Sequence, residues 1–333
     1  MTDPAIAVLP YGSQLGAALA QVPLDDLHWP LGRPDRLAAG QVGDLLPDDH
    51  LIVYPKTAMH FRLRWATPAR VSVMVVEPAA IHRRHLRLLR WTWRRFYRVL
   101  CHDDALLAAI PNGIMLPFGT SWVPDPSGLK IDKTRHMSLI ASAKRDTLGH
   151  QLRHEMVDLV RDEGLEVEIL GRGYAPFAEK SDGLAPYRFS VVIENIRERN
   201  YFTEKIVDAV LCETVPIYWG CPNIGDFMDT GGMVICEDAA QMKDAIRAAS
   251  GGCMTSLPPP CARPSRRRRI GPIWKAAPPA PSATVCEMQN AAPGAAFRVR
   301  REGIGSAADQ THAFQFQQNL MGAVVDVHAF GIQ

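Results

Sequence analysis

The clearest structural pattern in this 333-residue chain includes the stretch YRFSVVIENIRERNYFTEKIVDAVLCETVPIYWG, residues 187–220. Within it, FSVVIEN (189–195) and VPIYW (215–219) are short apolar runs, which are typical of buried strands. The segment from Thr203 to Cys212 is expected to be a helix, and Thr203 is a favourable N-cap residue. The stretch therefore predicts a strand, a helix and a second, parallel strand.

The same alternation continues on both sides of this stretch. The expected elements are strands at 137–142, 167–170 and 233–236 and helices at 150–164 and 238–249. The apolar residues of the first of these helices share one face before Gly164 ends it: Leu152, Met156, Val157 and Val160. This alternation predicts a doubly wound parallel sheet over residues 134–250.

Residues 1–133 carry a similar but weaker pattern. Short apolar runs bounded by Pro, Gly and Asp predict buried parallel strands at 6–9, 51–54, 71–76 and 114–118. Two such zones in one chain predict an α/β fold of two Rossmann-like domains facing a cleft, with a ligand at the carboxyl ends of the strands.

Residues 251–333 break the pattern. Segments such as PPPCARPSRRRR (258–269) are dense in Pro, Ala and Arg, and no amphipathic period remains. Such a composition predicts a tail of low order. A change of reading frame in a GC-rich gene is a second interpretation, and the abruptness of the break near Gly251 favours it. A comparison of the other two frames after codon 250 would distinguish the two.

The bulk composition excludes several classes of protein. A hydrophobic share of 47% and a charged share of 22% are those of a soluble globular protein, and a net charge of +2 does not indicate a nucleic-acid partner. No run of about 18 apolar residues and no basic secretory leader are present, so a cytoplasmic location is expected. The seven cysteines are scattered and Asp-x-Asp is absent, so we expect reduced thiols and no metal or other cofactor.

The segment IHRRHLRLLRWTWRRFYRV, residues 81–99, predicts a basic amphipathic helix. Its basic stripe consists of Arg83, Arg87, Arg90, Arg94 and Arg98. Such a helix suits peripheral contact with an anionic membrane or a lipid-linked acceptor. A helix packed on its domain with a solvated basic face is the commoner explanation of such a pattern, and the sequence leaves both interpretations open.

Two expected helix starts carry cations where the helix dipole disfavours them. Lys205 lies in the first turn after Thr203, and His150, Arg153 and His154 lie near the start of the helix at 150–164. A diphosphate bound between the two helix starts would resolve both conflicts. The alternative is that Lys205 and Arg153 reach solvent or pair with the neighbouring carboxylates Glu204 and Glu155.

Residues 187–220 resemble the C-terminal donor-binding motif of the α1,3/α1,4-fucosyltransferases, glycosyltransferase family 10. The shared pattern is Y-[KR]-F, then E-N, then Y-x-T-E-K, then P-[IV]-x-[YW]-G, and residues 138–157 are similar to the segment that opens this domain. The resemblance implies a glycosyltransferase B type fold with an acceptor-side domain at 1–133 and a nucleotide-sugar domain at 134–250. It also implies GDP-fucose or a close relative as donor, and inversion at the anomeric carbon.

The resemblance also implies site residues. Arg153 corresponds to the family's phosphate-binding arginine, and the residues that correspond to its donor contacts are Asn195, Tyr201, Glu204 and Lys205. Lys205 would neutralise the leaving diphosphate, and Glu204 would bond the ribose or the sugar. Glu77, at the end of the apolar run 71–76, is the candidate catalytic base; a capping or surface role for it is the alternative.

The function expected from these features is inverting transfer of fucose from GDP-fucose to a hydroxyl of a glycan or lipid-linked glycan. Two alternatives stay open: a related transferase that uses another nucleotide sugar, and an inactive protein that still binds a nucleotide sugar.

Overall fold

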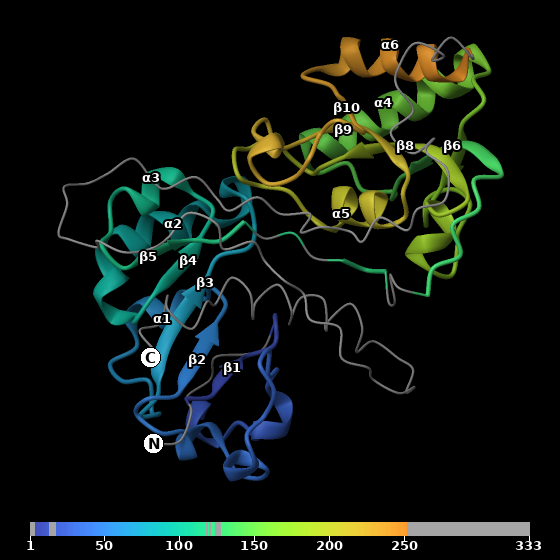
Figure 1. Cartoon of the computed structure of the whole chain (residues 1–333). Helices are drawn as coiled ribbons and strands as arrows, with labels where there is room; N and C mark the ends of the chain where they lie inside the picture. The colour runs from blue at the N-terminus through green and yellow to red at the C-terminus, as the bar shows by residue number, and fades with distance from the viewer. Residues whose placement is uncertain (1–3, 13–17, 118, 120, 124–127, 252–333) are drawn as a thin grey trace. The chain divides into compact units, whose positions relative to one another are not determined.

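The computed structural model describes residues 4–12, 18–117, 119, 121–123 and 128–251 (Figure 1). Over these residues the chain divides into two compact units, and the division falls between residues 118 and 119. Each unit contains a five-stranded sheet with parallel strands and its own hydrophobic core. The predicted class, two α/β units built on parallel sheets, is therefore confirmed. The sequence suggested a division near residue 133. The predicted tail lies outside the described residues, apart from Gly251.

In the first unit the strands lie side by side in the order of the sequence, β1-β2-β3-β4-β5. Their bounds are Ile6–Val8, His50–Val53, Arg70–Met74, Val99–Cys101 and Gly113–Met115. The helices are α1 (Thr57–Phe61), α2 (Ala79–Thr92) and α3 (Asp104–Leu107). Apolar residues cover both faces of the sheet, as the unbroken apolar runs predict. Strand β4, only three residues long, was not predicted.

The predicted helix at 81–99 is too long, because α2 ends at Thr92. A short 3-10 helix, Trp93–Arg95, follows, and the chain then turns into β4. The side-chain amide of Asn112 donates to the carbonyls of Trp93 and Phe96, at 3.1 and 2.9 Å, and this satisfies backbone acceptors where the helix has ended.

The basic stripe is therefore shorter than predicted. Arg94 and Arg98 lie beyond α2. Arg83, Arg87 and Arg90 do form an exposed basic face on the helix, next to the face that carries the buried Leu86 and Leu89.

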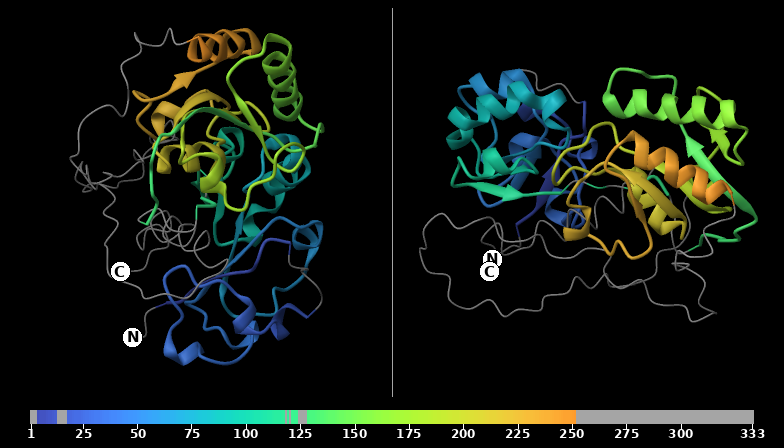
Figure 2. Two further views of the ribbon diagram at one scale, coloured as in Figure 1. Left: turned by 90° about the vertical axis from the view of Figure 1, so that its right-hand side faces the viewer. Right: turned by 90° about the horizontal axis from the view of Figure 1, so that it is seen from above.

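In the second unit the strand order is β10-β9-β8-β6-β7. The bounds of β6 to β10 are Arg135–Ile140, Glu168–Leu170, Tyr187–Ile193, Val215–Trp219 and Val234–Ile235. The helices are α4 (Leu148–Glu163), α5 (Glu204–Leu211) and α6 (Ala239–Ser250). Helices α4 and α6 cover one face of the sheet and α5 covers the other (Figures 1 and 2). Every strand and helix predicted for 134–250 is confirmed, with ends shifted by a few residues.

The packing of α4 follows the predicted apolar face. Its buried residues in the core with β6, β8 and β9 are Leu152, Met156, Val157 and Val160, as predicted, together with Leu159. Gly164 ends the helix in the left-handed conformation, with φ of 62°, as a C-terminal glycine does. Among the described helices, none is long and apolar enough to cross a lipid bilayer.

The strand order places a topological switch point between β6 and β8. The chain leaves β6 toward β7 on one side and returns to β8 on the other. Ligands of open parallel sheets bind outside the carboxyl ends of the strands at such a point. The start of α4 and the β8–α5 loop both lie at this edge, so the fold brings the two predicted helix starts together.

Candidate functional site

Glu194 directly follows β8 and is fully buried. Its side chain contacts the start of α5. Its Oε1 accepts the backbone N–H of Thr203 at 2.9 Å, and its Oε2 accepts the Thr203 hydroxyl at 2.6 Å. Thr203 in turn caps α5, accepting the N–H of Lys205 at 3.4 Å. A buried carboxylate therefore fixes the position of the helix start.

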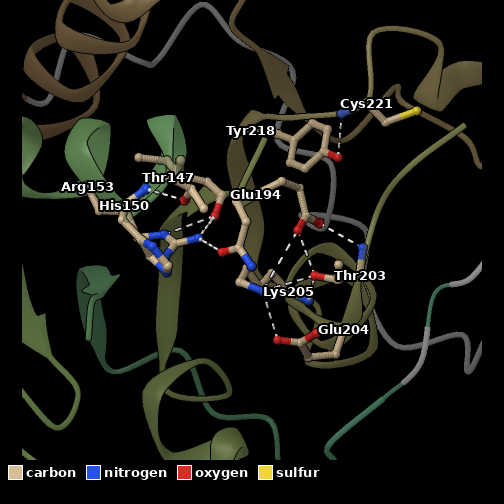
Figure 3. A network of polar contacts seen from close by, with 11 residues as sticks. Thr147, His150, Arg153, Glu194, Thr203, Glu204, Lys205, Tyr218 and Cys221 are labelled. Atoms are coloured by element: carbon tan, nitrogen blue, oxygen red, sulfur yellow. Dashed lines mark hydrogen bonds and ion pairs between the residues drawn. The ribbon is translucent and has the colours of Figure 1, made fainter. Parts of the chain in front are cut away.

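The ammonium of Lys205 lies among acceptors at this helix start. Nζ donates to Thr203 Oγ1 at 3.1 Å and to Glu204 Oε1 at 3.0 Å, and it lies 3.8 Å from Glu194 Oε2. Figure 3 shows Glu194, Thr203 and Glu204 gathered around Lys205. The predicted alternative, pairing of Lys205 with Glu204, is thus observed. The Lys205 side chain is nevertheless 21% exposed, which leaves it accessible to a ligand.

The charges of this cluster influence one another. Burial raises the pKa of Glu194 above its ordinary value, although Lys205 opposes the shift. Burial also acts to raise the pKa of Glu204, but the ammonium groups of Lys205 and Lys180 hold it below its ordinary value. With Arg153 included, three cations lie among the carboxyl groups of Glu194, Glu204 and Asp208, so an anion bound at this edge would meet positive charge.

Arg153 is buried and points at the end of β8. Its Nε and Nη2 donate to the carbonyl of Ile193 at 3.0 and 2.6 Å, and Nη2 also donates to Asn195 Oδ1 at 2.8 Å. Because α4 begins at Leu148, two residues before the predicted start, Arg153 lies in the second turn of the helix and not at its start. Through these hydrogen bonds Arg153 links α4 to Ile193 and Asn195 at the end of β8.

The predicted alternative partner of Arg153 is engaged elsewhere. Glu155 accepts from Lys243 Nζ at 2.7 Å on the surface of the unit. Arg153 itself neither reaches solvent nor pairs with Glu155. Burial lowers the pKa of its guanidinium, and the carboxylates of Glu194 and Glu204 oppose that shift.

Some backbone N–H groups in the first turn of α4 already donate hydrogen bonds to other residues of the chain. Thr147 caps the helix through the N–H of His150, and the N–H of Gly149 donates to the Asn195 carbonyl at 3.0 Å. His154 is committed to the Tyr174 hydroxyl and a backbone carbonyl. His150 differs: it is buried, and within the described part of the chain its Nδ1 has no hydrogen bond. Of the two histidines, His150 is thus the one with an unpaired ring nitrogen, and that nitrogen is buried.

Gly149 allows the close approach of α4 to β8. A Cβ at this position would lie 1.7 Å from the carbonyl oxygen of Glu194, a backbone atom that cannot move aside. We therefore expect Gly149→Ala to lower the free energy of unfolding by about 1–3 kcal/mol or more. Chemical denaturation measures this. Gly225→Ala is the control, since its nearest neighbours are 3.8 Å away; an equal loss in both variants would contradict the explanation.

Asp208, in α5, should make the stability of the protein depend on pH. It is fully buried in α5, and its Oδ1 accepts from the Ser121 hydroxyl at 2.7 Å and the Trp122 N–H at 3.0 Å. Burial raises the pKa of this carboxyl from 3.8 to about 7. The folded protein therefore keeps a proton that the unfolded chain releases, so this group costs stability increasingly as pH rises from about 4 to about 7.

Asp208→Asn should remove that dependence. Relative to the unmodified protein, the variant should gain about 2–4 kcal/mol of unfolding free energy between pH 4 and pH 7. The comparison requires denaturation curves across this range, with the exposed Asp162→Asn as control. A stability difference that stays constant with pH for Asp208→Asn would show that the carboxyl titrates normally.

The five residues predicted to contact a donor lie in the second unit. Arg153 contacts Asn195, and Glu204 contacts Lys205. Tyr201 is buried in the loop between β8 and α5 and acts electrostatically on Arg153. The fold thus places all five around the carboxyl end of β8. Their roles toward a donor stay predictions.

Glu77, the predicted base, belongs to the first unit. It follows β3 and is half-buried, and its Oε1 accepts the Tyr11 hydroxyl at 3.3 Å. Burial and the neighbouring Glu77 carboxylate raise the pKa of Tyr11. Glu77 therefore lies at the carboxyl edge of its own sheet, as predicted.

Two residues of the charged cluster were not singled out from the sequence. Glu194 follows the buried run FSVVI, and a carboxylate in such a place is a signal of a buried polar contact. Lys180 lies in the short 3-10 helix before β8, and no pattern in its own segment marks it. Its electrostatic interaction with Glu204 exists only because the fold brings the two side chains near each other.

Other features of the described residues do not compete with this site. No group of three or more His, Cys, Asp or Glu that could hold a metal ion occurs among them. A cavity of about 840 Å³ is lined in part by Arg135 and Tyr187, the first residues of β6 and β8. That is the amino edge of the sheet, away from the edge where parallel sheets bind ligands.

Comparison with known proteins finds a family match for the second unit. Residues 131–246 match the family described as "Glycosyltransferase family 10 (fucosyltransferase) C-term". The match covers the sheet, α4, α5 and most of α6, including all five predicted donor contacts.

Individual relatives are similar over parts of the chain. An α-(1,3)-fucosyltransferase of Helicobacter pylori, FucT, is 36% identical over 67 residues, which are 20% of this chain and 14% of that protein. A crystal structure of α1,3-fucosyltransferase with GDP has 18% identity and a TM-score of 0.40, covering 59% of this chain and 64% of that one. TarM of S. aureus has 10% identity and a TM-score of 0.43, covering 62% and 49%. The chain thus spans less than two thirds of the length of these proteins.

Proposed function

We propose that this protein, whose residues 131–246 form a family 10 glycosyltransferase C-terminal domain, is a glycosyltransferase that uses a nucleotide-diphosphate sugar. The observation that carries the proposal is the coincidence of the family match with two cations at the carboxyl edge of the second sheet. Arg153 and Lys205 lie there on the two sides of β8. This is the edge at which open parallel sheets bind nucleotides.

We further propose GDP-fucose as the donor. The support is the similarity to the H. pylori α-(1,3)-fucosyltransferase, which is 36% identical over 67 residues. Another nucleotide sugar is the alternative, since the charges of Arg153 and Lys205 would bind any diphosphate.

In the proposed reaction an acceptor hydroxyl attacks the anomeric carbon of the donor. The new glycosidic bond forms as the bond from that carbon to the β-phosphate oxygen breaks, so the configuration inverts and GDP leaves. Lys205 and Arg153 neutralise the charge that develops on the diphosphate. Asn195, Tyr201 and Glu204 orient the nucleotide and the sugar.

The proton of the acceptor hydroxyl passes to Glu77 in this proposal. A carboxylate that already accepts one hydrogen bond, from Tyr11, is held in a fixed orientation for this role. No metal is invoked, because the cations of the protein supply the positive charge. The acceptor is a glycan or lipid-linked glycan, and the exposed Arg83, Arg87 and Arg90 of α2 would suit anionic lipid headgroups.

Turnover of labelled GDP-fucose by the purified chain tests the proposal. We expect label to pass to glycan acceptors or, more slowly, to water, with GDP released and with no loss of rate in EDTA. UDP-sugars serve as the comparison. Turnover of a UDP-sugar but not of GDP-fucose would reverse the choice of donor, and GDP binding without any turnover would indicate an inactive binding protein.

A further inference from the structure

The loop that joins β8 to α5 is held by the segment that follows β9. Residues 195–201 of this loop include two of the predicted donor contacts, Asn195 and Tyr201. Residues 220–223 follow β9 and precede a short 3-10 helix, Ile224–Asp226. Because β8 and β9 are neighbouring parallel strands, both segments lie at the carboxyl edge of the sheet. Contacts between them therefore bear on the proposed donor site.

Asn223 makes a reciprocal pair of hydrogen bonds with Asn200. The backbone N–H of Asn200 donates to Asn223 Oδ1 at 2.9 Å, and Asn223 Nδ2 donates to Asn200 Oδ1 at 2.8 Å. Asn223 Nδ2 also donates to Asp226 Oδ2 at 3.0 Å, and the Cys221 thiol donates to Asn223 Oδ1 at 3.2 Å. The oxygen and the nitrogen of the Asn223 amide each have two partners, which fixes the orientation of this side chain.

Asn200 has a backbone conformation that needs such support. Its φ of 60° lies in the left-handed region, which costs free energy for residues other than glycine, although asparagine tolerates it better than most. The residue is also buried. A residue keeps such a conformation when the surrounding contacts hold it there. The two hydrogen bonds to Asn223 are contacts of this kind.

The segment that carries Asn223 is itself fixed in place. Gly220 has no room for a side chain, because a Cβ there would lie 2.5 Å from the Tyr218 hydroxyl. That hydroxyl accepts the backbone N–H of Cys221 at 2.9 Å (Figure 3). Both Tyr218 and Cys221 are buried. Asn223 therefore extends from a fixed part of the chain and can hold Asn200 in position.

Tyr201 directly follows Asn200, so its position depends on this pair of hydrogen bonds. The Tyr201 side chain is buried and acts electrostatically on Arg153 and on Tyr218. Arg153 is a proposed ligand of the donor phosphates. A change of the backbone at Asn200 out of the left-handed region would redirect the side chain of Tyr201. Misplacement of a group by about 1 Å can reduce the activity of an enzyme by about 100-fold.

We propose that Asn223 is a positioning residue of the donor site, which acts through Asn200 to fix the position of the Tyr201 hydroxyl. The inference rests on the proposed function and deepens it. It needs no contact between Asn223 and the donor, and every hydrogen bond that it uses lies within the second unit.

Calorimetric titration of the full chain with GDP tests this role. Asn223→Ala should weaken GDP binding by about tenfold or more, since it removes both hydrogen bonds to Asn200. Asp226→Ala is the matched control, because it removes the other acceptor of Asn223 Nδ2 and leaves the pair with Asn200 intact. Its GDP affinity should stay unchanged. Thermal melting shows that both variants fold.

A double-variant cycle separates a positioning role from a merely structural one. If Asn223 acts through the Tyr201 hydroxyl, Asn223→Ala should weaken GDP binding by less than about threefold in a chain that already carries Tyr201→Phe. A general disturbance of the unit would weaken binding equally in both backgrounds. Amide hydrogen exchange needs no ligand: Asn223→Ala should speed exchange over residues 196–201 by about tenfold and leave β6 unchanged.

Three results would overturn the inference: unchanged GDP affinity in Asn223→Ala, equal weakening with and without Tyr201→Phe, or equal weakening by Asp226→Ala. In each of these the unmodified chain still binds GDP, so the proposed function stands. Absence of GDP binding by the unmodified chain is instead a failure of the proposed function, and the positioning role of Asn223 fails with it.

Discussion

Replacing Lys205 by alanine should weaken GDP binding by about 10- to 100-fold. Hydrogen bonds to charged groups contribute about 1.5–3 kcal/mol, which corresponds to that range. The variant also leaves Glu194 and Glu204 without the ammonium that lies 3.8 and 3.0 Å from them, so uncompensated negative charge would face the diphosphate. Calorimetric titration with GDP and with guanosine measures the effect.

The nucleoside makes that titration specific to the phosphates. Guanosine affinity should change little, because it lacks the charge that Lys205 is proposed to neutralise. Lys243→Ala is the control, since Lys243 is a surface lysine paired with Glu155 at 2.7 Å. If Lys205→Ala binds GDP as tightly as the unmodified protein, the phosphate role of Lys205 is wrong.

Replacing Glu77 by glutamine should reduce the rate constant of sugar transfer by about 100- to 10,000-fold, the usual contribution of a general base. The amide retains the size of the side chain and can still accept from Tyr11, which is 3.3 Å away in the unmodified protein. It cannot take a proton at neutral pH. GDP affinity should be unaffected, because the proposed donor contacts lie in the second unit.

Steady-state kinetics with GDP-fucose, together with GDP calorimetry, separate these two expectations. Asp48→Asn is a suitable control, because this exposed carboxylate of the same unit makes only a surface pair with Arg70. Wild-type transfer rates in Glu77→Gln would remove Glu77 from the mechanism. A parallel loss of GDP binding would instead indicate that the substitution disturbs the protein.

The sequence predicted the second unit well because its elements carry local signals. Thr203 marks the start of α5, and Gly164 marks the end of α4, and the apolar runs between them have the length of buried strands. Local patterns of this kind do not depend on contacts between distant residues. The resemblance to family 10 added the identity of the domain, which the patterns could not supply.

The first unit shows where local signals fail. Strand β4 has only three residues and follows a basic helical pattern, so the predicted helix at 81–99 extended over it. The helix ends early because Phe96 is buried in the core and Asn112, distant in sequence, bonds the backbone there. Neither contact can be recognised within the 81–99 segment.

In the site, too, local patterns predicted some features, and contacts between distant residues determine the others. Arg153, Glu204 and Lys205 could be identified from helix starts and from the resemblance. The position of Arg153 in the second turn and its bonds to Ile193 and Asn195 could not, because they depend on how α4 packs on β8. The same holds for Glu194, whose partners follow nine residues later in the chain.

Part of the family pattern therefore has a structural explanation. Glu194 and Thr203 form a buried contact that positions α5. Gly220 is needed beside it, because a Cβ there would lie 2.5 Å from both Glu194 Cγ and the Tyr218 hydroxyl. Conformity to the pattern thus supports the fold of the domain before it supports any activity.

We propose that the second unit binds the nucleotide of a GDP-sugar. Titration calorimetry of the unmodified chain with GDP and UDP tests it most directly. We predict a GDP dissociation constant within about 1 µM to 1 mM, as is usual for enzyme substrates, and UDP binding at least about tenfold weaker. No detectable binding of GDP, or UDP binding as tight as that of GDP, would contradict the claim.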